Sequence, residues 1–361
     1  MKNYRNYIDE EVNLFDGVNV LSGENAQGKT NFLEALYYLT CGKSFRTRFD
    51  RELIRFGSQD TEIEAGFLSG GREQSLIIRI QTGRKKQILC NGAKINATEL
   101  SERLKAVLFC PEDLNLIRDG PAARRRFMDM AISQMRPVYA QFLSEYHKLF
   151  ESKSRILVQW RNQPSMLKIL PSFSERLCAV SARMIRYRAS FVERLSQDAL
   201  SVHEAFTEGK DQLSLQYRTV STVNNPFLSE KELFNLLSEH QKAFEDREIA
   251  SGRVLSGIHK DDIEILMNGQ NARSYASQGQ TRTAALSMIL AEREMVLHDI
   301  GEYPILLLDD VLSELDERRQ NFVLKHISGG QTLITSCDDG QISQRTGGRV
   351  FQVVNGKISH N

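Results

Sequence analysis

The sequence has no excess of charge of either sign and no long hydrophobic run. Its 47 lysine and arginine residues nearly cancel its 46 aspartate and glutamate residues, which leaves a formal net charge of +1. The whole molecule therefore carries no field typical of a nucleic-acid or membrane surface, and any DNA contact must come from a local patch. No apolar run reaches the roughly 20 residues that cross a bilayer, and no signal peptide is recognisable. We therefore expect a soluble, cytoplasmic protein that does not bind membranes.

Cysteine is also sparse. The five cysteines are scattered, and none forms a C-x-x-C pair or has a spacing that suits zinc. We interpret them as ordinary thiols of a reducing cytosol. What the chain does have is length, because 361 residues with 41% hydrophobic content favour two domains, or one domain with a large insertion.

A glycine-rich loop near the start of the chain is the strongest motif. Residues 23–30 fit the pattern G-x-x-x-x-G-K-[ST], and the apolar stretch Val18–Leu21 before them predicts a strand. Apolar residues follow at helical spacing: Phe32, Leu36 and Leu39. In such a strand, loop and helix, backbone N–H groups converge on phosphate oxygens, while Lys29 adds a charge and Thr30 a hydroxyl for Mg²⁺. The alternative is a glycine-rich turn that matches a short pattern by chance.

Two acids near the other end of the chain form a second motif. Residues 305–308 are apolar and predict a buried strand that ends at Asp309 and Asp310. Ligands of open α/β sheets bind at this edge. We expect Asp309 to hold Mg²⁺ through water and Asp310 to polarise an attacking water or accept its proton. Two solvated acids at a strand end are the alternative.

A third motif, Ser-Gln-Gly-Gln at 277–280, precedes a predicted helix. A hydroxyl, a bare glycine backbone and a helix N-terminus form an anion site together. One nucleotide needs only one phosphate cradle, so a second one makes sense chiefly if two subunits sandwich the ATP. The alternative is a simple helix N-cap at Ser277, because serine before a helix is a common N-cap. A further motif, Ser-Glu-Leu-Asp at 313–316, could line an interface, and a helix N-cap at Ser313 explains it equally well.

The remaining patterns predict an α/β fold. Residues 61–95 are β-rich, with a hairpin signal at Asn91-Gly92. Two stretches are helical and polar, 120–206 and 230–253, and Pro137, Pro164 and Pro171 interrupt the first, so no seam of a coiled coil runs through them. Strands and a helix return after Ile258. We predict one α/β head built from both termini, residues 1–118 plus 255–361, with a compact helical arm domain inserted at 119–254.

The order of these motifs, with a helical insert between them, resembles the ABC-type P-loop ATPase heads of the SMC (structural maintenance of chromosomes) group. Five further segments resemble the recombination mediators of that group: Asn-Tyr-Arg-Asn-Tyr at 3–7, Gly-Lys-Ser-Phe-Arg at 42–46, Phe-Cys-Pro-Glu-Asp-Leu at 109–114, Gly-Ile-His-Lys-Asp-Asp at 257–262 and Leu-Leu-Asp-Asp-Val-Leu-Ser-Glu-Leu-Asp at 307–316. The resemblance covers essentially the whole chain.

This resemblance implies a homodimer, induced by ATP, that binds duplex or gapped DNA without sequence specificity in the repair of damaged DNA. It implies a weak, DNA-stimulated ATPase used as a conformational switch, with RecO and RecR proteins as partners that help to load RecA recombinase. ATP and Mg²⁺ are the implied cofactors, with Thr30 and Asp309 at the metal and Lys29, Asp309, Asp310 and Ser277 in catalysis. The residues implied to contact ATP are Gly23, Asn25, Gly28, Lys29, Thr30, Asn31, Ser277, Gly279, Gln280, Arg5 and Arg46. For Arg5 and Arg46 the alternative is an exposed or ion-paired arginine.

Three departures from the resembled group affect these expectations. Its members begin with a β-strand before the Asn-Tyr-Arg-Asn-Tyr motif, so here an edge strand is missing or the start is misassigned. No histidine stands near residues 334–338, where ABC heads have a switch histidine, so we expect other groups to sense the γ-phosphate and turnover to be slow. Asp310 stands where most ABC heads have glutamate, which places the base on a shorter side chain.

Basic residues gather in three places that could contact DNA phosphates. They are Arg124, Arg125 and Arg126; Arg84, Lys85 and Lys86; and Arg183, Arg186 and Arg188. Each could equally be a solvated face. We expect His259 and Lys260, beside Asp261 and Asp262, to form internal hydrogen bonds or ion pairs instead of a metal site.

Two other functions remain as alternatives. A structural DNA tether like the long-armed SMC proteins would need a longer, unbroken arm and a C-x-x-C hook. The ATPase subunit of a transporter would need a smaller helical insert and the switch histidine.

Overall fold

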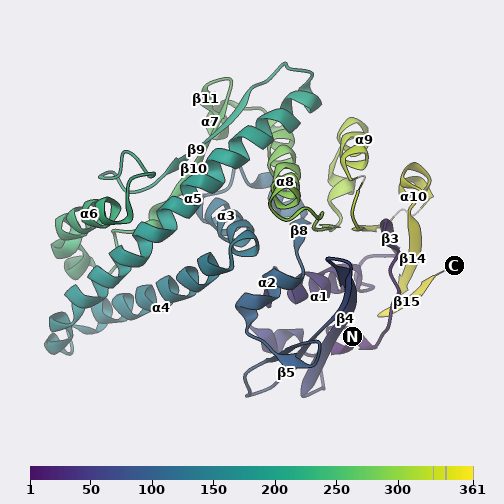
Figure 1. Ribbon diagram of the computed structural model, residues 1–361, viewed down its shortest axis with the longest axis horizontal. Coiled ribbons are helices and arrows are strands. Elements are labelled where there is room, and N and C mark those ends of the chain that lie inside the picture. The colour runs from purple at the N-terminus through teal and green to yellow at the C-terminus, as the bar shows by residue number, and fades with distance from the viewer. Residues whose placement is uncertain (328, 338–339, 361) are drawn as a thin grey trace. The chain divides into compact units, whose positions relative to one another are not determined.

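The computed structural model describes residues 1–327, 329–337 and 340–360, and Figure 1 shows its ribbon. The chain divides into two compact units: Met1–Leu114 with Glu292–Asn361, and Asn115–Ala291. The head that we expected from the sequence also held residues 255–291, whereas these residues pack in the second unit. The reason is strand pairing, because β10 (Asp262–Met267) pairs along its whole length with β9 (Leu213–Arg218).

A largely parallel sheet forms the centre of the first unit. Its strand order is β15 (Lys357–His360), β14 (Arg349–Val354), β3 (Val18–Ser22), β13 (Thr332–Ser336), β12 (Ile305–Leu308) and β8 (Ala106–Phe109). The inner strands are almost continuously buried, as expected of parallel strands covered on both faces. All strands but β15 are parallel, so their carboxyl ends meet at one edge of the sheet. Segments from both ends of the chain therefore share one edge.

The first unit also contains helices and short 3-10 turns. They are α1 (Lys29–Cys41), α2 (Leu100–Arg103), α9 (Glu317–His326) and α10 (Gly340–Thr346), with 3-10 turns η1 (Asp50–Leu53), η2 (Ala97–Glu99), η3 (Pro111–Asn115) and η6 (Val311–Glu314). Helix α1 follows β3 through the glycine-rich loop, as the sequence predicts. Its apolar residues Phe32, Leu33 and Leu39 are buried.

An antiparallel sheet is the second layer of the first unit. Its order is β2 (Tyr7–Asp9), β1 (Lys2–Tyr4), β4 (Asp60–Ser69), β5 (Arg72–Gln81), β6 (Gln87–Cys90) and β7 (Ala93–Lys94). The predicted hairpin is present, because Asn91 and Gly92 both have positive φ angles between β6 and β7. The β-rich stretch 61–95 thus forms the expected meander.

The second unit is mainly helical. It contains α3 (Pro121–Met135), α4 (Pro137–Gln159), η4 (Pro164–Lys168), α5 (Leu170–Thr207), α6 (Glu230–Ser251), η5 (Ile258–Lys260), α7 (Ala272–Tyr275), the beginning of α8 (Gln278–Ile300) and a sheet of β9, β10 and β11 (Gln270–Asn271). Figure 1 shows α4 and α5 side by side. Pro137, Pro164 and Pro171 all lie in the first turn of a helix, where proline has no hydrogen bond to lose. They begin helices instead of interrupting one.

Two buried ion-pair networks fix the helices of the second unit. Arg188 of α5 is 2% exposed and pairs with Asp129 at 2.8 Å and with Asp261 at 2.6 Å. Lys153 of α4 pairs with Glu248 of α6 at 2.7 Å, and both side chains are fully buried. No helix in the described part of the chain is long and apolar enough to span a bilayer.

Candidate functional site

The loop between β3 and α1 has two positions that only glycine fits. Gly28 has a φ of 122°, and a Cβ there would lie 2.7 Å from the side chain of Asn6. A Cβ on Gly23 would lie 2.4 Å from the carbonyl oxygen of Val353. The contact at Gly23 cannot be relieved because the neighbour is backbone, and the φ of Gly28 lies in a region that other residues rarely adopt, so the loop depends on both glycines.

Lys29 is the first residue of α1, and its ammonium group lies over this loop. Its Nζ donates to the carbonyl oxygens of Gly23 at 2.5 Å and Glu24 at 3.1 Å, and it lies 3.5 Å from Sγ of Cys337. Helix α1 has 13 residues and no acidic residue in its own first turn, so none of its own side chains neutralises the positive end of its dipole. Loop, lysine and helix end therefore have the chemistry of a phosphate cradle.

The two distant motifs of the sequence meet at the carboxyl edge of the parallel sheet. Oδ1 of Asp309 accepts hydrogen bonds from the hydroxyls of Thr30 and Thr335, each at 2.9 Å. Thr335 in turn accepts the backbone N–H of Asp310 at 2.7 Å. Thr30 follows β3 and Thr335 lies on β13, the parallel strand between β3 and β12, so strand order alone explains the meeting.

Burial shapes the electrostatics of this carboxyl group. Asp309 is 6% exposed, and burial raises its pKa above the ordinary value although the two threonine hydroxyls lower it. Asp310 adds a second negative charge and stands in the left-handed region with a φ of 53°. A bound cation would offset both the cost of burying the Asp309 carboxylate and its repulsion by Asp310.

The donors present fit Mg²⁺ shared with phosphates. Mg²⁺ prefers oxygen ligands and is usually held by one or two protein groups plus substrate phosphates. The Asp309 carboxylate and the Thr30 hydroxyl are such a pair, 2.9 Å apart. Within the described ranges, no group of three or more histidine, cysteine or acidic side chains could hold a metal without a ligand.

Residues of the Asn-Tyr-Arg-Asn-Tyr motif support the loop from behind. Asn6 donates to the carbonyl oxygen of Gln27 at 2.8 Å, and Tyr7 donates to that of Gly28 at 2.9 Å. Asn31 donates to the side chain of Asn6 at 2.8 Å. We did not predict these roles of Asn6 and Tyr7, although the motif itself was recognised. Asn31, which we expected to contact ATP, therefore contacts Asn6, one of the residues that support the loop.

Arg5 and Arg46 converge on one buried acid. Arg5 donates two hydrogen bonds to Glu34, at 2.9 and 2.8 Å, and Glu34 is fully buried. Arg46 donates to Asn31 at 2.6 Å and lies 3.7 Å from the same carboxylate. The ion-paired alternative therefore describes both arginines, but the Arg46 side chain is 43% exposed and keeps an open face.

A family model, the RecF/RecN/SMC N terminal domain, matches residues 1–359 of the chain. The chain belongs to this family. It is 39% identical over 373 residues to the DNA replication and repair protein RecF of Bacillus subtilis strain 168, covering 99% of this chain and 98% of that protein. It is 40% identical over 343 residues to the RecF protein of Geobacillus kaustophilus strain HTA426, covering 93% and 91%.

Solved structures agree with this assignment to the RecF/RecN/SMC family. A structure described as the recombination mediator protein RecF-ATP in the RecFOR pathway is 30% identical, covers 100% of this chain and 95% of that one, and has a TM-score of 0.87. An Smc head domain of Pyrococcus furiosus, 14% identical with a TM-score of 0.55, shares the fold across 100% of this chain and 94% of that one. The ABC-type ATPase fold predicted from the sequence is thereby confirmed.

The S-x-G-Q motif of this family member lies in the second unit as a helix cap. The backbone N–H of Ser277 donates to Gln280 Oε1 at 2.9 Å, and the N–H of Gln280 donates to Ser277 Oγ at 3.2 Å. Gln280 also reaches Asp211 at 3.2 Å. The local geometry is the N-cap that we kept as the alternative, and Ser277 is exposed at the start of α8.

The predicted DNA contacts of the chain are placed very differently from one another. Arg124 is 4% exposed and pairs with Asp262 at 2.7 Å, and Arg188 is buried in its own network, so neither is a surface cation and we withdraw both. Lys86 is held by Asp50 and by the hydroxyl of Tyr38, both at 3.0 Å. The other predicted cations on the surface are Arg84, Lys85, Arg126, Arg183 and Arg186, of which Arg183 pairs with Glu230.

Two smaller expectations concern the 257–262 segment and the switch position. Burial lowers the pKa of His259 to about 4, and its ring nitrogens contact the Tyr146 hydroxyl and the carbonyl oxygen of Val254, each at 3.1 Å. This is the internal hydrogen bonding that we expected.

At the switch position Cys337 contacts Asn25 at 3.2 Å, whereas residue 338 lies outside the described residues.

Proposed function

We propose that this chain is an ATP-dependent recombination mediator whose two copies close around ATP and bind DNA in the closed state. The observation that carries the proposal is the meeting of Thr30, Asp309 and Thr335 beside Lys29, which assembles phosphate and metal groups from opposite ends of the sequence. The relatives named RecF and the RecF structure described with ATP support the nucleotide and the repair role. RecO and RecR proteins follow as partners from the pathway that this description names.

Each residue of the site has a distinct role in this proposal. Lys29 moves its ammonium group from the loop carbonyls to the β- and γ-phosphates, and the N–H groups at the start of α1 bind the same oxygens. Thr30 and Asp309 hold Mg²⁺, which neutralises charge on the phosphates when it is bound. Asp310 orients the attacking water and accepts its proton. Gly23, Asn25 and Gly28 shape the loop around the nucleotide, and Asn31 with Arg46 stands beside it.

We place Ser277, Gly279 and Gln280 at the ATP of the other subunit. An exposed helix N-terminus with a hydroxyl at its cap attracts an anion, and helix α8 is 23 residues long. Two chains would then hold two ATP molecules between them, and hydrolysis would reopen the pair. The weak, DNA-stimulated ATPase is a switch in this account, and the protein acts in the cytoplasm.

In this proposal the exposed lysine and arginine side chains contact the DNA. Arg84 and Lys85 lie at the β5–β6 turn, and Arg126 and Arg186 are exposed on α3 and α5. Phosphate contacts alone give sequence-independent binding that weakens steeply with salt. Each charge removed lowers the salt slope of binding by about one unit.

A gel shift with duplex, single-stranded and gapped DNA tests the proposal. Wild-type protein is expected to bind DNA with ATP or a non-hydrolysable analogue, and at least about tenfold more weakly with ADP, because only the triphosphate closes the pair. Lys29→Met loses this difference, whereas Asp310→Asn keeps ATP bound and stays closed on DNA. Light scattering follows the dimer in parallel. Equal DNA binding in all nucleotide states, or a monomer at saturating Mg-ATP, contradicts the proposal.

A further inference from the structure

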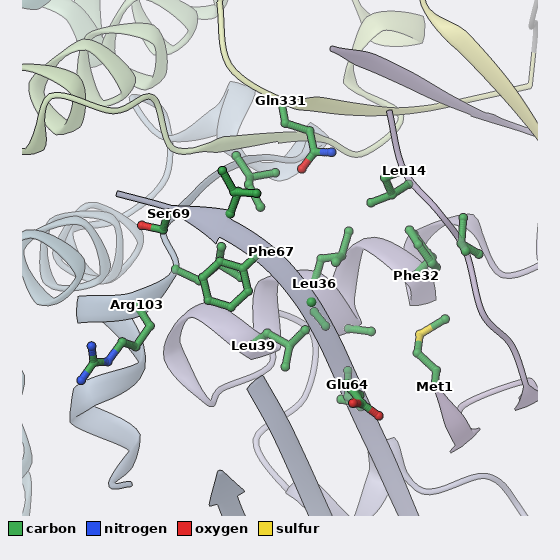
Figure 2. Close-up of a pocket in the computed structure, with 18 of the residues that line it drawn as sticks. Met1, Leu14, Phe32, Leu36, Leu39, Glu64, Phe67, Ser69, Arg103 and Gln331 are labelled. Carbon is green, nitrogen blue, oxygen red and sulfur yellow. The ribbon is translucent and has the colours of Figure 1, made fainter. Parts of the chain in front are cut away.

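The cavity drawn in Figure 2 lies in the first unit, apart from the groups that we propose to contact ATP. Its volume is about 930 Å³, and its walls include β4 and the side chains of Leu36 and Leu39 on α1. Neither the glycine-rich loop, residues 23–30, nor Asp309 is among the described residues that line it. The cavity therefore does not shape the ATP contacts. Residues 277–280, in the second unit, have neighbours that do.

The Ser-Gln-Gly-Gln motif lies at the end of a segment that begins at a hairpin turn. Asn268 and Gly269 join β10 to β11 with φ angles of 53° and 78°, and α7 then leads to Ser277. Of residues 268–280, all of which the structure describes, only Ala272 is buried. Packing alone holds this segment weakly, so the placement of the motif depends on hydrogen bonds at the ends of the segment.

Asp211, which lies just before β9, contacts both ends of this segment. Its Oδ1 accepts a hydrogen bond from Nδ2 of Asn268 at 2.9 Å, and its two oxygens accept from Nε2 of Gln280 at 3.2 and 3.3 Å. Beside it, the N–H of Gln212 donates to Oδ1 of Asn268, and the N–H of Asn268 donates to the carbonyl oxygen of Gln212, each at 2.8 Å. These hydrogen bonds tie both ends of residues 268–280 to the beginning of β9.

The carboxylate of Asp211 also decides which way the amide of Gln280 faces. A carboxylate accepts hydrogen bonds and donates none, so it holds the NH₂ group of the amide. The amide oxygen then faces the motif, where it accepts the backbone N–H of Ser277 at 2.9 Å. A reversed amide would set two donors against each other at this place. Asp211 therefore fixes the cap of α8 through Gln280.

This arrangement leaves the hydroxyl proton of Ser277 for a phosphate. A hydroxyl has one donor and two acceptor lone pairs, and Ser277 Oγ uses one lone pair to accept the N–H of Gln280 at 3.2 Å. The nearby carboxylate would be a strong acceptor for the hydroxyl proton, but its oxygens are bonded to Gln280 and Asn268 instead. The exposed hydroxyl is thus oriented by the chain and can donate outward.

We propose that Asp211 is a positioning residue for the contact that Ser277 makes with the ATP of the other subunit. The inference rests on the function proposed above, because it assigns a support to one side of that ATP site. Asp211 acts through Gln280 without contacting ATP itself. It keeps the cap in one conformation before the two chains meet, so that ordering the motif costs the dimer little.

The variant Asp211→Ala tests this role with two measurements. A fluorescent ATP analogue at low protein concentration is expected to bind the single chain within about twofold of wild type, because the groups that hold ATP there are unchanged. Light scattering over a range of protein concentrations at saturating Mg-ATP should show dimerisation weakened about 25-fold. Losing one orienting hydrogen bond costs about fivefold, and the closed dimer contains the same site twice.

Two further variants separate the hydrogen bond from charge and from stability. Asp211→Asn keeps an oxygen for the Gln280 amide and removes the charge, so it should dimerise within about threefold of wild type. Glu264→Ala is the matched control, because it removes an acid of the neighbouring strand β10 that pairs with Arg218 at 2.6 Å. It should change dimerisation less than about twofold. Tighter dimerisation of both Asp211 variants would mean that the carboxylate only repels the phosphate, which contradicts the proposal.

A double-mutant cycle shows whether Asp211 acts through Gln280. Gln280→Ala removes the amide that Asp211 orients and is expected to weaken ATP-induced dimerisation at least as much as Asp211→Ala. Adding Asp211→Ala to Gln280→Ala should then change dimerisation by less than about twofold, because nothing is left to orient. Losses that multiply in the double variant would show that Asp211 acts on its own and would overturn the positioning role.

The outcomes also distinguish this inference from the function on which it rests. If Ser277→Arg abolishes ATP-induced dimerisation and Asp211→Ala leaves it unchanged, the positioning role is wrong and the proposed dimer stands. If Ser277→Arg dimerises like the wild type, the ATP contact of Ser277 and the role of Asp211 are both wrong. Weaker ATP binding by the single Asp211→Ala chain would assign Asp211 to folding stability and contradict the inference.

Discussion

Glu292 carries a carboxyl group into the interior of the first unit. It lies on α8, is 6% exposed, and has a pKa raised to about 8 by burial and by the negative charge of Asp113. The native protein therefore holds this group protonated at neutral pH, whereas the unfolded chain ionises it near 4.5. The residue is part of no proposed site, so its effect should be one of stability alone.

The pH dependence of unfolding tests this state of Glu292. Below about pH 4.5 both states are protonated, and between about 4.5 and 8 only the native state keeps the proton, so the unfolding free energy falls by up to about 1.4 kcal/mol per pH unit. Above about pH 8 the loss is complete. Glu292→Gln cannot ionise and is expected to remove this decline, which urea unfolding at pH 5.5 and 8.5 measures. If the variant and the wild type lose stability equally between these pH values, Glu292 is already ionised in the native state.

At the scale of elements, the helices of the second unit depend on charges that are out of reach of solvent. Lys153 of α4 contacts Gln241 and Glu248 of α6, each at 2.7 Å. Glu248 also accepts the N–H groups of Leu255 at 2.7 Å and Ser256 at 3.1 Å, which ties the end of α6 to the chain that follows it. A buried charge pair adds little net stability, but removing one partner leaves the other charge unpaired.

Lys153→Met is therefore expected to destabilise the protein by about 3–5 kcal/mol. Adding Glu248→Gln removes the stranded charge while keeping an acceptor for the two N–H groups, so the double variant should regain a large part of the loss. The exposed pair of Arg183 and Glu230 is the control, and Arg183→Ala should have little effect. Chemical unfolding of the three variants gives the comparison. A double variant less stable than Lys153→Met would show that the Glu248 charge left by Lys153→Met is not destabilising, which contradicts this account.

The elements that the sequence predicts are those whose pattern is local. Strand β3, helix α1 and strands β12 and β13 were predicted because apolar runs and helical spacing are visible in one short window. Strands β8, β9, β14 and β15 were not predicted, since short runs such as Ala106–Phe109 do not distinguish strand from helix. One signal was available, because Asn355-Gly356 has the hairpin composition and joins β14 to β15 with positive φ angles.

Some residues of the site can likewise be predicted from local motifs, whereas others are revealed only by tertiary packing. Lys29, Thr30 and Asp309 were predicted from motifs, and their meeting follows from the strand order. Thr335 and Tyr7 contact the site through tertiary packing, so no local pattern indicates them. Arg124 and Arg188 show the reverse error, because charge in a sequence does not reveal that a partner such as Asp262 or Asp261 buries it.

At the scale of the whole molecule, the proposed dimer separates ATP binding from dimerisation. The groups that we propose to hold ATP within one chain lie in the first unit, whereas Ser277 lies in the second. Ser277→Arg places a long cation at the cap of α8 and is expected to leave ATP binding by one chain within about twofold, while ATP-induced dimerisation is lost. Light scattering and a fluorescent ATP analogue measure the two properties separately.

A second helix cap supplies the control for this variant. Ser229 caps α6 in the same way, with its hydroxyl accepting the N–H of Glu232. Ser229→Arg removes an equivalent cap in the same unit, which costs about 1 kcal/mol, and should still dimerise with ATP. Loss of the dimer in both variants would assign the effect to stability and not to an ATP contact by Ser277.

The position of β3 in the sheet determines when the nucleotide site can form during synthesis. In the parallel sheet β3 lies between β13 and β14, so the strand that leads into the glycine-rich loop waits for residues 332–354 before it has a neighbour. A ribosome makes the two neighbours of β3 more than 300 residues after β3 itself. We expect the helical unit, which is continuous in sequence, to fold on the nascent chain before the ATP site forms, while β3 stays available to chaperones until residues 332–354 have been made.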